Sequence, residues 1–157
     1  VVIATGASAK RLGVSGEDKY WGTGGVSACA VCDAPMYKEK DVIVVGGGDS
    51  AVEQVFQLSP YVRSIKLFVR KDKMRASSAM QEKLKSYPKA TVMFNHEIKS
   101  ISGNNLILEE VEVLNNKTGQ LTKEKIDGIF LAVGHEPKTG LFNNQVAMEN
   151  GYIKTNQ

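Results

Sequence analysis

The feature that most constrains the fold is a glycine-rich turn that joins a largely apolar run to a helical pattern. Residues 41–45 are typical of a buried parallel strand. Residues 49–59 then repeat apolar side chains at helical spacing, and residues 64–69 are typical of a second strand. A strand, a glycine turn, a helix and another strand within about 30 residues predict a βαβ unit.

The turn carries the pattern Gly46-x-Gly48-x-x-Ala51, which is typical of dinucleotide-binding sites. Gly46 permits a tight turn, and Gly48 has no Cβ, so a pyrophosphate can approach the backbone there. Ala51 lets the following helix lie close to the strand, and the N-terminus of that helix offers unpaired N–H groups to the phosphates. An ordinary tight turn between a strand and a helix is the alternative interpretation.

A basic run follows the second strand of the unit and bears on which dinucleotide is bound. A site that prefers NAD usually places Asp or Glu here, where the carboxylate bonds the ribose 2′-hydroxyl. This chain places Arg70, Lys71 and Arg75 here, and Asp72 comes only after two of these cations. Guanidinium and ammonium groups suit a 2′-phosphate, so the sequence favours NADPH. A solvated basic turn is the alternative.

The two cysteines, Cys29 and Cys32, are separated by two residues, and Asp33 follows directly. In a redox disulfide, one thiolate attacks a partner and the other resolves the mixed disulfide. A zinc site would need two further ligands, but His96 and His135 are far away in sequence and there is no second Cys-x-x-Cys motif, so we expect no metal. Inert core thiols are a third interpretation. Asp33 is a candidate general acid or base, or simply a carboxylate at a helix start.

The other apolar runs extend the βαβ unit into a larger sheet. We expect one mostly parallel sheet from residues 41–45, 64–69, 91–94 and 129–133. Residues 97–126 predict an antiparallel meander on one side of it. A helix is expected over residues 77–87, with Ser77 or Ser78 as its N-cap, and residues 1–7 are typical of a buried strand. The expected fold class is α/β, a Rossmann-like three-layer dinucleotide-binding domain with a parallel sheet plus an antiparallel β-meander.

Composition narrows the class of protein and of partner. The chain has 157 residues, which fits one domain, and its 42% hydrophobic and 24% charged residues are typical of a soluble globular protein. A formal net charge of +3 is too small to indicate a nucleic-acid partner. No apolar run approaches the roughly 18 residues of a membrane span, so we expect no membrane partner and a cytoplasmic location. The N-terminus has neither an initiator Met nor a basic signal-peptide region, and its abrupt start suggests that a preceding part is absent.

Several motifs of this chain occur together and in the same order in a known family. They include Val-Ser-Ala-Cys-Ala-Val-Cys-Asp at residues 26–33, Gly-Gly-Gly-Asp-Ser-Ala-Val-Glu at 46–53 and Val-Gly-His-Glu-Pro at 133–137. With residues 4–7, 69–77 and 151–153, they make the chain resemble the low-molecular-weight thioredoxin reductases over essentially its whole length. The Val-Arg-Lys-Asp run that begins at Val69 is similar to the fungal-type members, whereas histidine and two arginines are usual in bacterial ones.

The resemblance implies a domain organisation and an activity. In that family an FAD domain is built from two chain segments, and the NADPH domain is inserted between them. By this analogy, residues 1–25 are a flank that joins a missing FAD domain, residues 26–135 are the NADPH-binding domain with the disulfide, and residues 136–157 lead back toward a missing FAD segment. The whole protein would be an NADPH-dependent thioredoxin-disulfide reductase with FAD, a homodimer whose partner is thioredoxin. The fragment alone would be inactive.

The resemblance also implies roles for individual residues. In the family NADPH reduces FAD, FAD reduces the disulfide, and the dithiol reduces thioredoxin. By position, Cys32 would face the flavin, Cys29 would attack thioredoxin and Asp33 would donate a proton. The positions that resemble NADPH contacts of the family are Ser50, Arg70, Lys71, Arg75, Val133 and Tyr152. With the glycine turn, the expected nucleotide-binding residues also include Gly46, Gly48, Asp49 and Ala51. The chain departs from the family at Ala34, because the usual sequence there is Cys-Asp-Gly.

Two other functions remain open from the sequence. One is a related flavoprotein, such as the flavin subunit of a peroxide-reducing system, which would carry an additional thioredoxin-like domain upstream. The other is a nucleotide-binding sensor module whose thiols are regulatory, which a full-length chain without an FAD fingerprint would favour. The residues that precede Val1 would discriminate between these functions.

Overall fold

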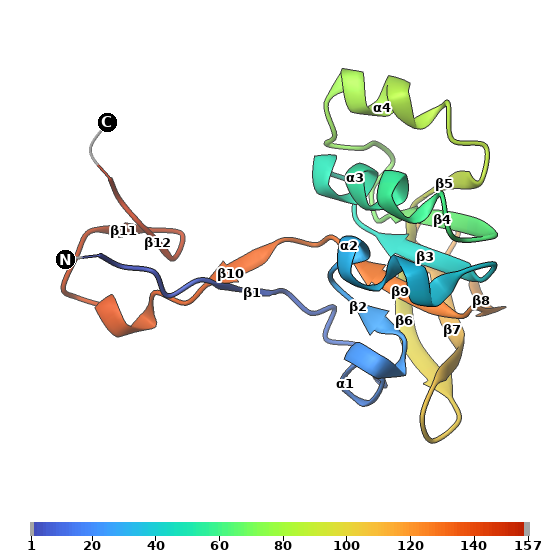
Figure 1. Cartoon of the computed structure of the whole chain (residues 1–157), viewed down its shortest axis with the longest axis horizontal. Coiled ribbons are helices and arrows are strands. Elements are labelled where there is room, and N and C mark those ends of the chain that lie inside the picture. The colour runs from blue at the N-terminus through green and yellow to red at the C-terminus, as the bar shows by residue number, and fades with distance from the viewer. Residues whose placement is uncertain (1, 156–157) are drawn as a thin grey trace. The chain divides into compact units, whose positions relative to one another are not determined.

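The structure, a computed structural model, describes residues 2–155 and divides the chain into two compact units. The larger unit is Arg11–Val133, and the smaller one combines the described parts of residues 1–10 and 134–157 (Figure 1). In the smaller unit β1 (Ala7–Ala9) pairs with β10 (His135–Pro137), and β11 (Met148–Glu149) pairs with β12 (Tyr152–Ile153). The boundaries expected at residues 26 and 135 refer to a domain of the whole protein and stay a prediction.

A five-stranded parallel sheet lies at the centre of the larger unit (Figure 1). Its strands, in spatial order, are β2 (Val26–Ser27), β9 (Gly128–Leu131), β3 (Asp41–Val45), β4 (Ser64–Val69) and β5 (Ala90–Phe94). All neighbouring strands are parallel. The four apolar runs that were expected to share one sheet do share it, so that prediction is confirmed.

Helices cover one face of this sheet. The longest is α3 (Asp49–Leu58), whose buried residues pack with Val42 and Val44 of β3. The shorter helices α2 (Ala30–Asp33) and α4 (Ser78–Leu84) and the 3-10 helix η2 (Ala34–Tyr37) also contribute buried residues to this layer. Tyr20 of α1 (Glu17–Tyr20) instead packs on the other side, with Ile43 and Val45 of β3, and the 3-10 helix η1 (Gly22–Gly24) follows α1 in the chain. A third 3-10 helix, η3 (Gly140–Phe142), belongs to the smaller unit. Ser77 is the N-cap of α4, because its hydroxyl accepts a hydrogen bond from the Met80 amide. Within residues 2–155 every helix is too short or too polar to span a lipid bilayer.

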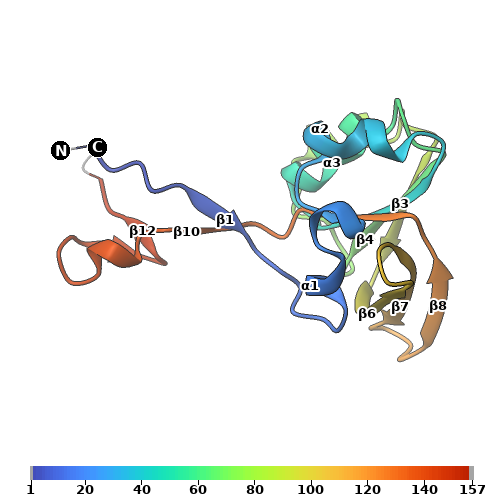
Figure 2. The ribbon, with the colours of Figure 1, turned by 60° about the horizontal axis from the view of Figure 1, so that its bottom comes forward.

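The opposite face of the parallel sheet is covered by an antiparallel meander (Figure 2). Its strands are β6 (His96–Gly103), β7 (Leu108–Asn115) and β8 (Leu121–Lys125). Ile43 and Val45 of β3 point to this side and pack with the buried residues of the meander, since side chains alternate along a strand. The layers are therefore helices, parallel sheet and meander, as the sequence predicted.

A cluster of polar groups holds the start of β3 beside β4. The Asp41 carboxylate accepts hydrogen bonds from the Arg63 guanidinium and, at 2.6 Å, from the Ser64 hydroxyl. The bond from Arg63 is the main cause that lowers the pKa of Asp41, although partial burial opposes it. The Asp41 amide donates to Asp127 at 2.8 Å, so the same residue also connects the sheet to the turn before β9.

The expectation of a buried strand over residues 1–7 is wrong for the described part of that run. Residues 2–6 form no strand, and the side chains of Val2 and Ile3 are exposed. Val1 lies outside the described residues. An apolar pattern indicates that a segment needs a partner surface, but it does not supply one, and the described chain packs no layer against this run.

Candidate functional site

The two outer glycines of the turn after β3 have different surroundings. A Cβ at Gly46 would lie 2.6 Å from the carbonyl oxygen of Ala132 and 2.9 Å from the Cβ of Ala51, so the packing of α3 and of the chain after β9 requires glycine. A Cβ at Gly48 would meet nothing within 4 Å. Gly48 therefore leaves open space at the N-terminus of α3, where a phosphate could approach.

The basic loop that follows β4 is held onto this turn by its backbone. The amides of Arg75 and Ala76 donate to the Gly47 carbonyl at 2.6 and 3.0 Å. The Asp49 carboxylate accepts from the Ser77 amide at 2.7 Å, which joins the start of α3 to the end of the loop. Folding thus brings the basic loop and the glycine turn together, and Asp49 contributes by fixing the loop.

A cleft of about 470 Å³ opens beside the turn. The positions expected from the sequence that line it are Gly46, Arg70, Lys71, Arg75 and Val133. Its other wall was missed from the sequence and includes Arg11, Leu12, His96, Glu97 and Lys99. Other expected positions lie in the turn or in the first residues of α3 and do not line the cleft, namely Gly48, Asp49, Ser50 and Ala51. Tyr152 belongs to the smaller unit, where it is exposed.

Positive charge is concentrated on the wall formed by the basic loop. The exposed cations that line this wall are Arg70, Lys71, Lys73 and Arg75. None of them takes part in a salt bridge within residues 2–155. On the opposite wall Lys99 pairs with Glu97, and Arg11 stacks on the Trp21 ring, 3.3 Å from its centroid. The loop wall is therefore the one with cations available for a phosphate.

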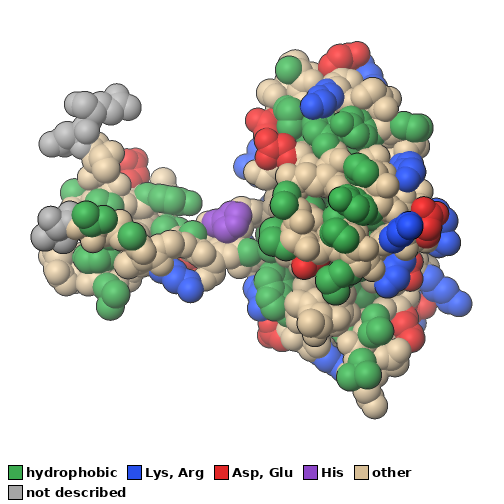
Figure 3. Space-filling model, viewed as in Figure 1, with side chains coloured by type: hydrophobic (Ala, Val, Ile, Leu, Met, Phe, Trp, Pro, Cys, Tyr) green, Lys and Arg blue, Asp and Glu red, His purple; other side chains and the backbone are tan. Residues whose placement is uncertain are grey.

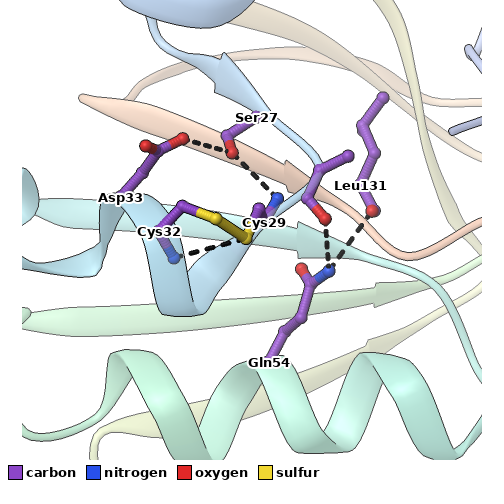
Figure 4. The surroundings of a disulfide bond; sticks show 7 residues. Ser27, Cys29, Cys32, Asp33, Gln54 and Leu131 are labelled. Atoms are coloured by element: carbon purple, nitrogen blue, oxygen red, sulfur yellow. Dashed lines mark hydrogen bonds between the residues drawn. A yellow bond between two sulfur atoms is a disulfide. The ribbon is translucent and has the colours of Figure 1, made fainter.

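Cys29 and Cys32 form a disulfide at the start of α2 (Figure 4). Their Cα atoms are 5.3 Å apart, and the Cys29 sulfur accepts a hydrogen bond from the Cys32 amide at 3.3 Å. Cys32 is exposed and Cys29 is half-buried, so a partner can reach the bond from solvent. The expected disulfide is confirmed. Within residues 2–155, His, Cys, Asp and Glu side chains form no group of three that could hold a metal ion.

Ser27 ties Asp33, the last residue of α2, to the disulfide loop. Its hydroxyl donates to Oδ2 of Asp33 at 2.6 Å and accepts from the Cys29 amide at 3.0 Å (Figure 4). The pKa of the nearby Tyr37 is raised, mainly because the phenol is buried and also because the negative charges of Asp33 and Asp127 lie near it. Ser27 lies in the motif at residues 27–33, but the sequence assigned it no role.

Gln54 connects the disulfide loop to the helix that begins at the glycine turn. Its Nε2 donates to the carbonyl oxygens of Ala28 and Leu131 at 3.3 and 3.4 Å (Figure 4). Its Oε1 is buried and has no hydrogen-bond partner within the described chain. Because Gln54 lies on α3, one helix starts at the nucleotide-type turn and also supports the residue before Cys29.

Apolar side chains are exposed beside the disulfide. Val31 of α2 is 69% exposed and Met36 of η2 is 59% exposed. Figure 3 shows apolar side chains at the surface of this part of the larger unit. Exposed apolar side chains that gather next to a reactive group are typical of a surface that contacts another protein.

Comparison with known proteins gives one consistent family. A family model described as pyridine nucleotide-disulphide oxidoreductase matches residues 1–157. The chain is 44% identical to a thioredoxin reductase of Yarrowia lipolytica and 43% identical to one of Schizosaccharomyces pombe, in each case over 99% of this chain and 49% of the relative. The crystal structure of Lactococcus lactis thioredoxin reductase matches with a TM-score of 0.89 at 34% identity, over 96% of this chain and 50% of that one. The chain thus spans about half the length of the curated relatives it matches.

Proposed function

Because the chain belongs to the pyridine nucleotide-disulphide oxidoreductase family, we propose that it is the NADPH-binding and disulfide-bearing part of a thioredoxin reductase. The observation that carries the proposal is that one compact unit holds both a dinucleotide-type turn with free cations and a Cys-x-x-Cys disulfide. In the whole protein, two electrons would pass from NADPH by way of FAD to this disulfide and then to thioredoxin. FAD would be held by parts of that protein outside this chain.

The residues of the cleft fit NADPH. The open space at Gly48 and the N-terminus of α3, a helix of 10 residues, suit a pyrophosphate. The free cations Arg70, Lys71 and Arg75 suit the 2′-phosphate, which NADH lacks. Val133 also lines the cleft, and we propose it as a further nucleotide contact. Contacts at Ser50 and Tyr152 are proposed on the resemblance alone.

The disulfide centre fits a two-step thiol exchange. After reduction, the Cys29 thiolate would attack the thioredoxin disulfide, and the bond that breaks leaves its electron pair on a thioredoxin sulfur. Asp33 would give that sulfur a proton. Cys32 would then attack the Cys29 sulfur, the mixed disulfide would break, and the second thioredoxin sulfur would leave with the electron pair and take a proton from solvent, so that thioredoxin is released as a dithiol. Cys32 is also the sulfur proposed to face the flavin, in keeping with the family resemblance.

The surroundings of the disulfide support a protein as the partner. Val31 and Met36 offer exposed apolar area beside the sulfurs, which a thioredoxin could cover. We propose a homodimer for the whole protein, and this rests on the resemblance alone. A cytoplasmic location is proposed because thiols are kept reduced in that compartment.

The proposal is tested by replacing each sulfur in the whole protein. We expect Cys29→Ser and Cys32→Ser each to abolish thioredoxin reduction, because neither variant can form the disulfide, while flavin reduction by NADPH remains. Rapid-mixing absorbance of the flavin measures the first half of the reaction, and a thioredoxin-coupled assay measures the second. A double serine variant that still reduced thioredoxin would show that this motif is not the reaction centre.

A further inference from the structure

Ser27 is a buried hydroxyl with two fixed partners at the disulfide centre. It is the second residue of β2, where it pairs with Phe130 of β9, and it is 4% exposed. A buried hydroxyl is costly unless it is hydrogen-bonded, and this one accepts from the Cys29 amide and donates to Asp33. A polar side chain placed so deeply is unusual, because Ser27 and Glu17 are the buried polar residues within the described chain.

We propose that Ser27 is a positioning residue that orients Asp33 for proton transfer during thiol exchange, an inference that rests on the proposed function. An acid or base is effective when a third group fixes its orientation. The Ser27 hydroxyl holds Oδ2 of Asp33 at 2.6 Å. The same oxygen atom of Ser27 holds the Cys29 amide at 3.0 Å, so it fixes the carboxylate relative to the backbone of the attacking cysteine.

The geometry also assigns the two carboxylate oxygens. Because Oδ2 accepts from Ser27, Oδ1 is the oxygen left to carry the transferred proton. In the first exchange, the Cys29 thiolate forms a bond to one partner sulfur, the partner S–S bond breaks, and the leaving sulfur takes the proton from Oδ1. In the second, Cys32 gives its proton to the Asp33 carboxylate and attacks the Cys29 sulfur. The mixed disulfide breaks, its electron pair stays on the second partner sulfur, and that sulfur leaves as a thiolate that takes a proton from water. Two electrons reach the partner, and Asp33 ends in the state in which it began.

A proton donor matters only where the leaving sulfur needs a proton. An alkyl thiolate is a poor leaving group, so its departure is helped by proton transfer, whereas an acidic aromatic thiolate leaves readily without one. Ser27→Ala should therefore slow exchange with an alkyl disulfide and spare exchange with an aromatic one. A residue that only stabilised the loop would affect both reactions equally.

The experiment uses the whole protein, reduced with dithiothreitol and freed of the reductant, with no nucleotide or thioredoxin added. Its thiols are reacted with hydroxyethyl disulfide or with 5,5′-dithiobis(2-nitrobenzoate), and the remaining thiols are counted by alkylation and mass. For Ser27→Ala we expect about a tenfold loss of rate with the alkyl disulfide, as for a lost hydrogen bond to a charged group, and no comparable loss with the aromatic one. Ser27→Thr, which keeps a hydroxyl, should restore most of the rate.

Two controls make the result specific. Ser64 donates to Asp41 at the same distance of 2.6 Å, so Ser64→Ala removes a matched serine–aspartate bond away from the sulfurs and should leave both rates unchanged. The double variant Ser27→Ala with Asp33→Asn should be no slower than Asp33→Asn alone, because Ser27 acts through Asp33. Ser27→Gly removes the same hydroxyl with a smaller side chain and serves if Ser27→Ala unfolds.

Equal slowing with both disulfides, or a further loss in the double variant, would overturn the role of Ser27. The outcome is independent of the proposed function, since no nucleotide, flavin turnover or thioredoxin enters the measurement. Failure of the cysteine variants to stop thioredoxin reduction would defeat the proposed function and leave this result standing.

Discussion

The nucleotide cleft and the disulfide centre are built in different ways. The cleft draws on the end of β3, the loop after β4, the start of β6 and residues 11–14, and its cations are exposed. The disulfide centre lies almost wholly within residues 27–33, and its polar atoms are paired at fixed distances. Binding in the cleft should therefore weaken by degrees as single cations are removed. Chemistry at the disulfide should depend on individual atoms.

We expect substitutions in the glycine turn to have a larger effect on NADPH binding than any other substitution in the cleft. A smaller effect would contradict this comparison of the two sites. Gly46→Ala places a carbon too close to the Ala132 carbonyl, and overpacking of this kind costs about 1–3 kcal/mol. We therefore expect a lower melting temperature together with weaker NADPH binding. Thermal unfolding and calorimetric titration of the whole protein measure the two quantities.

Gly48→Ser is the matched variant, because a Cβ there meets nothing within 4 Å and serine is a good N-cap. The melting temperature should be unchanged, while the hydroxymethyl group occupies the space proposed for the pyrophosphate. Loss of one charge-assisted contact costs about 1.5–3 kcal/mol, so NADPH affinity should fall by more than about tenfold. Unchanged affinity in Gly48→Ser would mean that the pyrophosphate does not lie at this turn.

The basic loop should give smaller and more selective effects, which sharpen the comparison. Arg70→Ala and Arg75→Ala each remove a proposed contact to the 2′-phosphate, so NADPH should bind about 1.5–3 kcal/mol more weakly while NADH changes little. Lys85→Ala is the control, because Lys85 pairs with Glu82 on α4 and does not line the cleft. Equal losses for NADPH and NADH would show that the loop does not read the 2′-phosphate.

Much of the fold could be predicted from local sequence patterns. Apolar runs and helical spacing placed β3, α3 and β4, since each pattern is set by neighbouring residues. Residues 1–7 show the limit of this reasoning. Their apolar pattern predicts a buried strand, yet Val2 and Ile3 are exposed and pack against no layer of the described chain. An apolar pattern indicates which side chains favour burial. It does not indicate whether a surface is present to bury them.

The same distinction holds for the candidate site, where features set by neighbouring residues could be predicted and features set by the tertiary fold could not. The Cys-x-x-Cys motif was visible because its chemistry lies within a few residues, and the structure forms the expected disulfide. The wall of the cleft that contains His96 and Lys99 could not be predicted from the sequence, because only the tertiary fold brings β6 close to the glycine turn. Ser27 and Gln54 were missed for a related reason. Serine and glutamine have no distinctive spacing, and only their hydrogen bonds to Asp33 and Ala28 reveal them.

The central claim is that NADPH and the disulfide occupy separate places, so that electrons need a third group to pass between them. Cys29 and Cys32 do not line the cleft, which supports this separation. The most direct measurement is to add NADPH without oxygen to the whole protein, with and without its flavin, and to count the thiols released by alkylation and mass. We expect both thiols to appear only when flavin is present, although NADPH binds in either case. Thiols released by NADPH in the flavin-free protein would contradict the account.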